Sequence, residues 1–364
     1  MTRKVGTAVI GLGSIGSIHT DWYSCIPESE LVAVCSRRQT VLREYERKYG
    51  VKGYTDYREL LEDKKVEAVT ISTPPYLHCQ MAIEAAKAGK HVAVEKPLAI
   101  SVKEADEMIG AVGKLGVQDI YLENLCFAPS YTTAKRIVEV GGVGDVYFCK
   151  AREACDLMVG SEAEHAMIQR KGHWDWLFNP VQSGGGCLIN MGCHPIQYIR
   201  YLYNNIRVKK VFAEITEQVG SPKPKGIEDA VLLVMKFEDE RVGTIEASYY
   251  ADGGQSDKAE IYGNKGTILI DLYTRNPITV NSHLGYSFQQ SAFLPPSENK
   301  GWTFPVPDEN YSLGYYHELR HFLQSILQDR RPTVNFDDGR ATLEIIEAGY
   351  KSHNTGQAVA LPAS

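Results

Sequence analysis

The stretch Ala8-Val9-Ile10-Gly11-Leu12-Gly13-Ser14-Ile15-Gly16 decides the fold of the amino-terminal half of the chain. An apolar, β-branched run ends here in the pattern G-x-G-x-x-G, and a helix-compatible stretch follows. Glycine permits a tight turn at the first position, close approach of a pyrophosphate at the second, and close helix–strand packing at the third. The new helix N-terminus, with Ser14 and Ile15, offers N–H groups and partial positive charge to phosphates. A purely structural glycine turn is the alternative, but the strand–turn–helix context and a second strand after it favour a dinucleotide site.

Strands and helices alternate through residues 1–125. Strands are predicted at Val5–Ile10, Glu30–Cys35, Ala68–Ser72, His91–Val94 and Asp119–Leu122, and helices at Ser14–Cys25, Thr40–Tyr49, Leu77–Ala88 and Val102–Lys114. This alternation predicts an α/β domain over residues 1–125 with a doubly wound parallel sheet of the Rossmann type. Because ligands bind at the carboxyl ends of the strands in such a sheet, we expect the functional residues of this half there.

The pattern changes in residues 126–364, where a second, α+β domain is predicted. Strands with partial alternation are expected at Val146–Arg152, Val208–Glu217, Val231–Phe237, Gly243–Tyr250, Ala259–Tyr262 and Thr267–Asp271. Helices are expected at Thr132–Glu139, Pro195–Tyr203, Tyr315–Gln328 and Gly339–Ser352, and residues 285–312 are expected to be loop. Short polar turns between the strands indicate a largely antiparallel, open sheet with one face covered.

Composition bounds the class of protein. Of 364 residues, 43% are hydrophobic and 23% charged, and the formal net charge is −6. The chain has no cluster of Lys and Arg, which argues against a nucleic-acid surface. No apolar run reaches the roughly 20 residues that span a bilayer, and no signal-peptide segment opens the chain. We therefore expect a cytoplasmic protein with no nucleic-acid or membrane partner, and eight scattered cysteines without a C-x-x-C pair predict no metal site.

The residues after the second strand bear on the choice of cofactor. An acidic residue about twenty positions past the last glycine usually holds the adenosine ribose 2′-hydroxyl. Here Ser36 stands at that position and Arg37-Arg38 follow. A hydroxyl and guanidinium groups hold a 2′-phosphate, which a carboxylate repels, so the sequence favours NADP(H) over NAD(H). NAD(H), with the arginines on the solvated surface, is the alternative.

Two further loops leave the sheet at its carboxyl edge. Thr73-Pro74-Pro75 form an extended loop able to lie over the nicotinamide ribose, and His78 follows at a helix start, where a cap or surface role is the alternative. Glu95-Lys96-Pro97 follow the next strand. A lysine in the cofactor crevice can hydrogen-bond a substrate hydroxyl, whereas the alternative is a structural pair with Glu95.

The second cluster is a glycine-rich turn that ends in a histidine. Asn190 and His194 lie four residues apart, and Pro195 places His194 at a helix start with Asn190 in the preceding turn. Histidine titrates near neutrality and can take a proton from an alcohol. A buried core histidine is the alternative reading of the same residue.

Together these motifs resemble the glucose–fructose oxidoreductase, inositol dehydrogenase and MocA-like (Gfo/Idh/MocA) family. The resemblance is carried, in family order, by Gly11-x-Gly13-x-x-Gly16, Thr73-Pro74-Pro75 with His78, Glu95-Lys96-Pro97, the Gly-Gly-x-Leu-x-Asn-x-Gly-x-His pattern ending at His194, and Tyr262-Gly263-Asn264-Lys265-Gly266. The stretch from Asp338-Gly339-Arg340 through Tyr350 to Thr355-Gly356 is also similar, so the resemblance covers essentially the whole chain.

The resemblance implies both a reaction and an assembly. It implies hydride transfer between C4 of a nicotinamide and a hydroxyl-bearing carbon of a sugar, inositol or related polyol. Lys96 matches the family's catalytic lysine and His194 its catalytic histidine. The open sheet of residues 126–364 is implied to serve substrate binding and to build homodimers or homotetramers.

The sequence departs from the family pattern at two positions near His194. The family often has aspartate where Asn190 stands and another acid where Gln197 stands. Because a neutral amide cannot stabilise an imidazolium as a carboxylate does, we expect His194 to be less basic than in relatives and Lys96 to share the proton work. Asn190 is expected to bind a substrate hydroxyl.

Weaker candidates surround these residues. Glu123 and Asn124 follow the last strand of the first half, and Trp174 and Trp176 precede the glycine-rich turn. Carboxylates bind hydroxyls and aromatic faces stack on sugar C–H groups, so all four are candidates for lining the substrate pocket. Plain core packing is the alternative for the tryptophans.

Two other functions stay open at this point. One is a glycoside lyase or hydrolase that oxidises its substrate transiently and recycles a tightly held cofactor. The other is a non-catalytic, nucleotide-sensing regulatory protein, to which the departures at Asn190 and Gln197 point and against which the retention of Lys96 and His194 argues.

Overall fold

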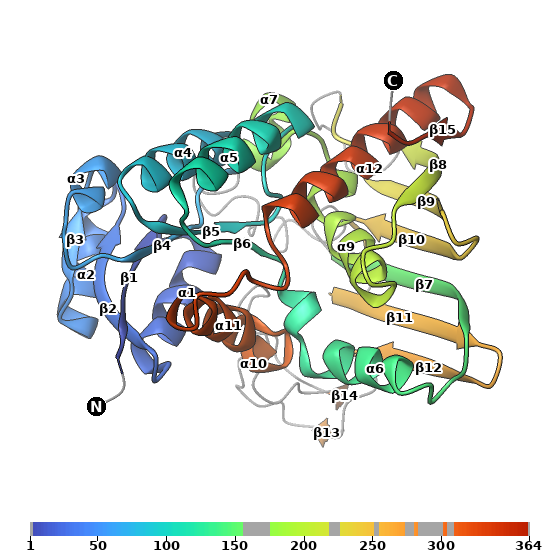
Figure 1. Ribbon diagram of the computed structural model, residues 1–364, viewed down its shortest axis with the longest axis horizontal. Coiled ribbons are helices and arrows are strands. Elements are labelled where there is room, and N and C mark those ends of the chain that lie inside the picture. Colours follow the sequence, from blue (N-terminus) through green and yellow to red (C-terminus); the bar gives the residue numbers. More distant parts are fainter. Residues whose placement is uncertain are drawn as a thin grey trace. The chain divides into compact units, whose positions relative to one another are not determined.

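In the computed structural model the chain forms two compact units (Figure 1). Unit 1 consists of Met1–Asn124 and Gly314–Ala341, and unit 2 of Leu125–Leu313 and Thr342–Ser364. The structure describes residues 3–155, 175–217, 226–250, 255–273, 280–282, 301–303 and 309–362. The segment Gly314–Ala341 therefore joins unit 1, although it follows most of unit 2 in the sequence.

Unit 1 contains a six-stranded sheet in the order β3-β2-β1-β4-β5-β6. Its strands are β1 (Val5–Ile10), β2 (Ser29–Cys35), β3 (Lys52–Tyr54), β4 (Ala68–Ile71), β5 (His91–Glu95) and β6 (Asp119–Leu122), and every pairing is parallel. All residues of β1, β4 and β6 are buried, as expected for parallel strands covered on both faces. The predicted doubly wound parallel sheet is confirmed, with β3 as an additional edge strand.

Helices cover both faces of this sheet. They are α1 (Ser14–Cys25), α2 (Gln39–Tyr49), α3 (Tyr57–Leu61), α4 (His78–Lys87), α5 (Val102–Leu115) and α11 (Tyr315–Leu327), with a 3₁₀ turn η1 (Pro75–Leu77). Helix α11 packs on α1, where Arg320 pairs with Glu28 at 3.0 Å and the ring of Tyr316 meets the edge of Trp22. This packing explains why the segment after Leu313 belongs to unit 1.

Unit 2 is built on a seven-stranded sheet in the order β12-β11-β7-β10-β9-β8-β15. Its strands are β7 (Val146–Cys155), β8 (Val208–Thr216), β9 (Ala230–Phe237), β10 (Val242–Ser248), β11 (Gln255–Gly263), β12 (Gly266–Asp271) and β15 (Val359–Ala360). Only β7 and β10 pair in parallel among these strands, and the other neighbours are antiparallel. The predicted, mostly antiparallel sheet is confirmed.

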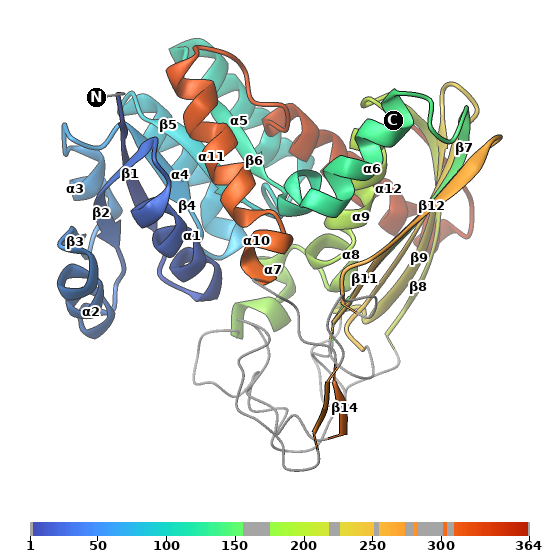
Figure 2. The same ribbon diagram turned by 90° about the horizontal axis from the view of Figure 1, so that it is seen from below.

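One face of this sheet carries the helices of unit 2. These are η2 (Asn124–Phe127), which crosses the boundary between the units, α6 (Pro129–Glu139), η3 (Asp175–Phe178), α7 (Pro180–Ser183), α8 (Cys187–Asn190), α9 (Cys193–Leu202), α10 (Glu309–Ser312) and α12 (Phe336–Thr355), which begins in unit 1. Figure 2 shows α6, α9 and α12 on the same side of the strands. Cys149 and Ala151 of β7 are buried beneath them, whereas Lys150 between the two is exposed on the other face.

Two short elements lie in the stretch 285–312 that was expected to be loop. The structure describes residues 301–303 and 309–312 of that stretch, and these form β14 (Gly301–Thr303) and α10. Strand β14 pairs antiparallel with β13 (Val280–Ser282). Among the described residues, none of the helices has the length and apolar character that crossing a membrane requires.

Candidate active site

The glycine loop after β1 is held by contacts that tolerate no side chain at two of its positions. Gly11 has φ +97°, and a Cβ built on it meets the carbonyl oxygen of Ser72 at 2.6 Å. A Cβ on Gly16 meets the carbonyl oxygen of Gly11 at 1.8 Å, so α1 lies directly against the turn. The hydroxyl of Ser72 donates to that same carbonyl at 2.8 Å. The loop is thus tied to the end of β4.

Gly13, in contrast, faces open space. A Cβ built on Gly13 has no heavy atom of the described residues within 4 Å. Gly13 is the N-cap of α1, Ser14 and Ile15 are the first two helical residues, and the first turn contains no acidic residue. An open backbone at an uncharged helix start forms a cradle that fits a pyrophosphate.

The end of β2 reaches over this loop. Arg38 donates from its guanidinium to the carbonyl oxygen of Leu12 at 2.8 Å, and its main-chain N–H donates to the hydroxyl of Ser36 at 3.3 Å. Ser36 is buried, while Arg37 and Arg38 are exposed. Of the three predicted adenosine-side residues, Arg38 contacts the glycine loop directly and Ser36 contacts Arg38, while Arg37 lies between them in the sequence.

His78 joins two of the predicted loops to each other. Its Nε2 lies 2.8 Å from the carbonyl oxygen of Thr73, and its Nδ1 lies 3.0 Å from that of Pro97. The ring is fully buried, which lowers the pKa of His78. Both ring nitrogens of His78 thus lie against main-chain carbonyl oxygens, and the ring links the loop of Thr73-Pro74-Pro75 to that of Glu95-Lys96-Pro97.

Lys96 leaves the sheet directly after β5. One carboxylate oxygen of Glu95, Oε2, accepts the main-chain N–H of Lys96 at 3.0 Å, and the Lys96–Pro97 peptide bond is cis. Glu123 and Asn124 follow β6, the neighbouring strand of the same sheet. All predicted site residues of unit 1 thus lie at the carboxyl edge of the parallel sheet.

In unit 2 a buried carboxylate organises the glycine-rich turn. Glu228 accepts the N–H of Gly186 at 2.8 Å through Oε2, and through Oε1 it accepts the N–H of Leu188 at 2.9 Å and the hydroxyl of Tyr350 at 2.7 Å. Burial raises the pKa of Glu228, and these donors act in the opposite direction. A Cβ on Gly185 would meet the Tyr350 hydroxyl at 2.2 Å, so the turn requires glycine there.

The turn places Asn190 and His194 on consecutive helices. Asn190 is the last residue of α8, and His194 is the second residue of α9, whose first turn contains Pro195. The side chain of Asn190 lies beside the hydroxyl of Tyr249, whose pKa is raised by burial. Gln197 is buried one turn further on, where its Oε1 accepts the hydroxyl of Thr342 at 2.9 Å and a guanidinium N–H of Arg200.

The two predicted tryptophans differ in what the structure describes. Trp176 lies in the 3₁₀ turn η3 and is half-buried. Trp174 lies outside the described residues. The roles of Glu228 and Tyr350 in this turn were missed by sequence reasoning, and the available signal was an acidic pair, Glu228-Asp229, directly before the half-buried strand β9.

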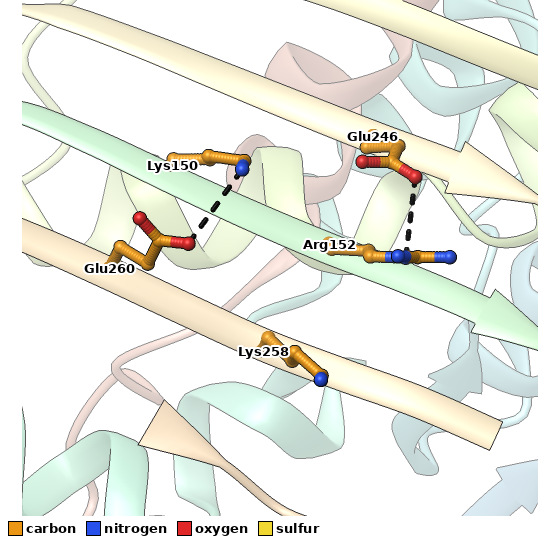
Figure 3. A pocket seen from close by; sticks show the side chains of 5 residues that line it. All are labelled: Lys150, Arg152, Glu246, Lys258 and Glu260. Atoms are coloured by element: carbon orange, nitrogen blue, oxygen red, sulfur yellow. Dashed lines mark ion pairs between the residues drawn. The ribbon is translucent and has the colours of Figure 1, made fainter. Parts of the chain in front are cut away.

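A charged depression on the sheet of unit 2 is separate from this turn (Figure 3). It is lined by Lys150, Arg152, Glu246, Lys258 and Glu260, which come from β7, β10 and β11. Lys150 lies 3.6 Å from Glu260, and Arg152 lies 3.3 Å from Glu246. Lys258 pairs with Asp271 at 3.1 Å. All five residues occupy the face of the sheet opposite to α9 and each is engaged in an ion pair, so the depression is not a candidate for the substrate site.

Comparison with known proteins adds the family context. Residues 5–122 match the profile described as "Oxidoreductase family, NAD-binding Rossmann fold", and residues 131–269 match that of the "GFO/IDH/MocA C-terminal domain". The myo-inositol 2-dehydrogenase of Thermotoga maritima is 28% identical over 358 residues, which cover 97% of each chain. The scyllo-inositol 2-dehydrogenase (NAD(+)) of Bacillus subtilis is 27% identical, with 99% of this chain and 97% of that protein covered.

Solved structures share the fold over the whole length. The crystal structure of GenD2 from gentamicin A biosynthesis in complex with NAD has a TM-score of 0.87 and 24% identity, and the match covers 100% of this chain and 98% of that one. This likeness confirms the arrangement of a parallel-sheet unit followed by a unit with an open, mostly antiparallel sheet.

Proposed function

The chain belongs to the Gfo/Idh/MocA family of oxidoreductases, and from this premise we propose that it is an NAD(P)-dependent dehydrogenase or reductase of sugars, inositols or glycosides. The reaction is the transfer of a hydride between the nicotinamide and a secondary alcohol or its ketone. The observation that carries the proposal is the carboxyl edge of the unit 1 sheet. At this edge the open cradle at Gly13 follows β1 and the loop of Lys96 follows β5, and only β4 lies between these two strands in the sheet. The names of the inositol dehydrogenases among the relatives support a polyol as substrate.

The cofactor is held by this chain's own loops. Gly11, Gly13 and Gly16 with the first N–H groups of α1 bind the pyrophosphate, and Thr73-Pro74-Pro75 line the nicotinamide ribose. A nicotinamide dinucleotide held by these residues would supply hydride-transfer chemistry at C4 of its ring. For the adenosine ribose we propose that Ser36, Arg37 and Arg38 favour a 2′-phosphate, and hence NADP(H), because no carboxylate follows β2. NAD(H) is the competing cofactor, and relatives whose names or structures include NAD favour it.

We propose that His194 and Lys96 take part in transfer of the substrate hydroxyl proton. In the oxidative direction His194 accepts the proton of the substrate hydroxyl, while Lys96 donates a hydrogen bond to the same oxygen. Asn190 is neutral and cannot stabilise an imidazolium as a carboxylate does, so we assign a share of the proton work to Lys96. Glu123, Asn124, Trp174 and Trp176 are proposed to contact the remaining hydroxyls and C–H faces of the substrate.

The open sheet face of unit 2 is proposed to form a homodimer or homotetramer. Strand pairing places Leu269 opposite Glu260, and Glu260 opposite Lys150, on the face away from α9. Leu269 is 51% exposed and Leu232, on the same face, is 55% exposed. Exposed leucines beside compensated ion pairs are typical of a surface that a partner covers.

This assembly is tested by the mass of the protein in solution. Replacing both Leu232 and Leu269 by aspartate is expected to reduce the mass measured by light scattering to that of the monomer. Replacement of Val140, which is 82% exposed at the end of α6, by aspartate is the matched control. An unchanged oligomer in the double variant rules out this face as the interface.

The catalytic proposal is tested by turnover with a panel of inositols and sugars. The K96A and H194A variants are expected to bind both nicotinamide cofactors with parental affinity and to lose at least about 100-fold in kcat, the range of general acid–base catalysis. If H194A retains near-full turnover, Lys96 or another group is the base. Cofactor that copurifies and is released only on denaturation, without net turnover, favours the transient-oxidation mechanism of a lyase or hydrolase instead. Parental activity in K96A removes the assignment of Lys96.

A further inference from the structure

Three buried, ionisable side chains meet inside unit 1 behind the loop of Lys96. They are His19 of α1, Glu95 at the end of β5, and Glu318 in the first turn of α11. Nε2 of His19 lies 3.1 Å from Oε1 of Glu95 and 3.8 Å from Oε1 of Glu318. His19 and Glu318 are fully buried, and Glu95 is 6% exposed. Nothing in the dinucleotide-binding role of this unit requires two carboxyl groups in one buried cluster.

We propose that His19, Glu95 and Glu318 form a triad that positions Lys96, in which Glu318 holds a proton and Glu95 stays a carboxylate. The inference rests on the proposed function, because it takes Lys96 as the residue that touches the substrate. His19, Glu95 and Glu318 themselves are positioning residues, which act on the reaction only through the loop that Lys96 begins.

The assignment of the proton follows from the hydrogen-bond partners. Two carboxylates a few ångströms apart in a low-dielectric interior cannot both remain ionised. Glu95 receives a main-chain donor, because its Oε2 accepts the N–H of Lys96 at 3.0 Å. Among the described residues, neither carboxyl oxygen of Glu318 has a hydrogen-bond donor. The proton therefore belongs on Glu318.

The surroundings of Glu318 agree with a neutral acid. The titratable groups facing it are His19 and Tyr23 of α1, Glu95 of β5 and Glu123 after β6. Burial, followed by the charges of Glu95 and Glu123, raises the pKa of Glu318 well above its ordinary range. The hydroxyl of Tyr23 is engaged elsewhere, 2.7 Å from that of Thr70.

The triad connects the three elements that shape the carboxyl edge. Helix α1 begins at the cradle of Gly13, β5 ends in Glu95, and α11 joins the cluster from the far end of the chain. Oε2 of Glu95 accepts the N–H of Lys96 at 3.0 Å and Oε1 lies 3.1 Å from Nε2 of His19, so the carboxyl group of Glu95 joins α1 to the point at which the chain leaves β5. Loss of either neighbour frees that carboxylate and, with it, the loop of Lys96.

The protonation state is measured without any turnover. We expect the infrared spectrum of the parent protein at pH 7 to contain the C=O stretching band of a protonated, buried carboxyl group. The band is expected to vanish in E318Q and to persist in E95Q. If E318Q leaves the spectrum at pH 7 unchanged, the proposed proton on Glu318 is wrong, whatever the enzyme's activity.

Kinetics test the positioning of Lys96. H19N is expected to lower kcat at least ten-fold with the cofactor Kd within two-fold of the parent, and to shift the limb of the pH–kcat/KM profile that K96A abolishes. E318Q, the conservative variant, is expected to restore most of the kcat that E318A loses. H91N, at the opposite end of β5, is the matched control and is expected to keep the parental profile. An unshifted limb in H19N refutes the positioning role.

Metal analysis tests the alternative that the triad is a metal site. His19, Glu95 and Glu318 also present ligand atoms within 4.8 Å of one another, a set that a divalent cation accepts. The proposal requires that the purified protein, dialysed against zinc or manganese, retain less than a tenth of an equivalent of either. One equivalent of metal that is lost in E318A overturns it.

If no substrate turns over but the infrared band behaves as expected, the proposed function fails and the protonated triad stands.

Discussion

Replacing Ser36 by aspartate is expected to reverse the cofactor preference. Ser36 is the first residue after β2, and the neighbouring Cys35 carbonyl accepts the N–H of Gly11 at 2.9 Å, so this position lies at the cradle. A carboxylate there accepts hydrogen bonds from the ribose hydroxyls of NADH and repels the 2′-phosphate of NADPH. Two unit charges about 5 Å apart interact by about 3 kcal/mol at an effective dielectric constant of about 20, and screening at this partly exposed edge lowers that. We expect a net loss of ~2 kcal/mol, or about 30-fold in the NADPH Kd.

Substitutions of Arg37 and Arg38 are expected to distinguish a contact with the 2′-phosphate from a contact with the glycine loop. The guanidinium of Arg38 holds the Leu12 carbonyl at 2.8 Å, so R38A is expected to weaken both cofactors by about 1 kcal/mol, and NADPH by more. R37A is expected to weaken NADPH alone, by about 1.5–3 kcal/mol for a charge-assisted hydrogen bond. Arg47, exposed in the last turn of α2, supplies the control R47A.

Fluorescence titration of each variant with NADPH and with NADH is the assay. The parent is expected to bind NADPH at least ten-fold more tightly, a difference of about 1.4 kcal/mol. If S36D and R37A leave the ratio of the two Kd values at that of the parent, Ser36-Arg37-Arg38 do not form a phosphate site. The reasoning from the missing carboxylate is then refuted.

Three further predictions concern the two units separately. G16A is expected to destabilise the fold by about 1–3 kcal/mol, because its Cβ would lie 1.8 Å from the Gly11 carbonyl oxygen. G13A is expected to keep the parental melting temperature and to weaken only cofactor binding. Equal melting temperatures of G16A and G13A would contradict this prediction. Because the pKa of Glu318 is raised in the folded protein, this side chain adds stability that is complete below pH 4.5 and is lost as pH rises through the folded-state pKa. The free energy of unfolding in urea is therefore expected to fall with pH by up to about 1.4 kcal/mol per pH unit in the parent and not in E318Q. The same pH dependence in both proteins would exclude a protonated Glu318. E228A leaves the N–H donors of Gly186 and Leu188 buried without their acceptor. It is expected to lower the free energy of unfolding, measured by chemical denaturation, by more than about 2 kcal/mol, and E228Q by an intermediate amount. A denaturation midpoint of E228A equal to that of the parent would show that water replaces the carboxylate.

The continuous apolar runs made the parallel sheet predictable. The predicted bounds Val5–Ile10 and Ser14–Cys25 match β1 and α1, because the strand is a short apolar run that ends at a glycine turn and the helix begins directly after that turn. The pattern failed at β3 and α3, which contain three and five residues. Elements that short hold too few positions for any period to be read, and they form because β2 and the adjoining chain offer them a surface.

The place of α11 was beyond the sequence for a different reason. The helix itself was predicted as Tyr315–Gln328, within one residue of the observed Tyr315–Leu327. Its buried residues Leu319, Phe322 and Leu323 would fit against any apolar surface. Its place in unit 1 depends on specific partners on and near α1, such as Trp22 for the ring of Tyr316 and Glu28 for Arg320 at 3.0 Å, and these matches appear only when both partners are placed.

The same distinction separates the site residues that could be predicted from those that could not. Gly11, Gly16 and Lys96 were predicted as site residues because each meets a local requirement of the chain: a positive φ, a close approach, or a strand end. His19 and Glu318 answer a requirement that exists only after folding, since each is a buried polar group whose partner comes from another element. A signal was nevertheless present. Glu318 follows Tyr315 by three residues and precedes Leu319 by one, which puts an acid on the apolar face of its helix. An acid at such a position is costly to bury unless it is paired or neutral, so it marks a tertiary partner even when the sequence does not say which residue that partner is.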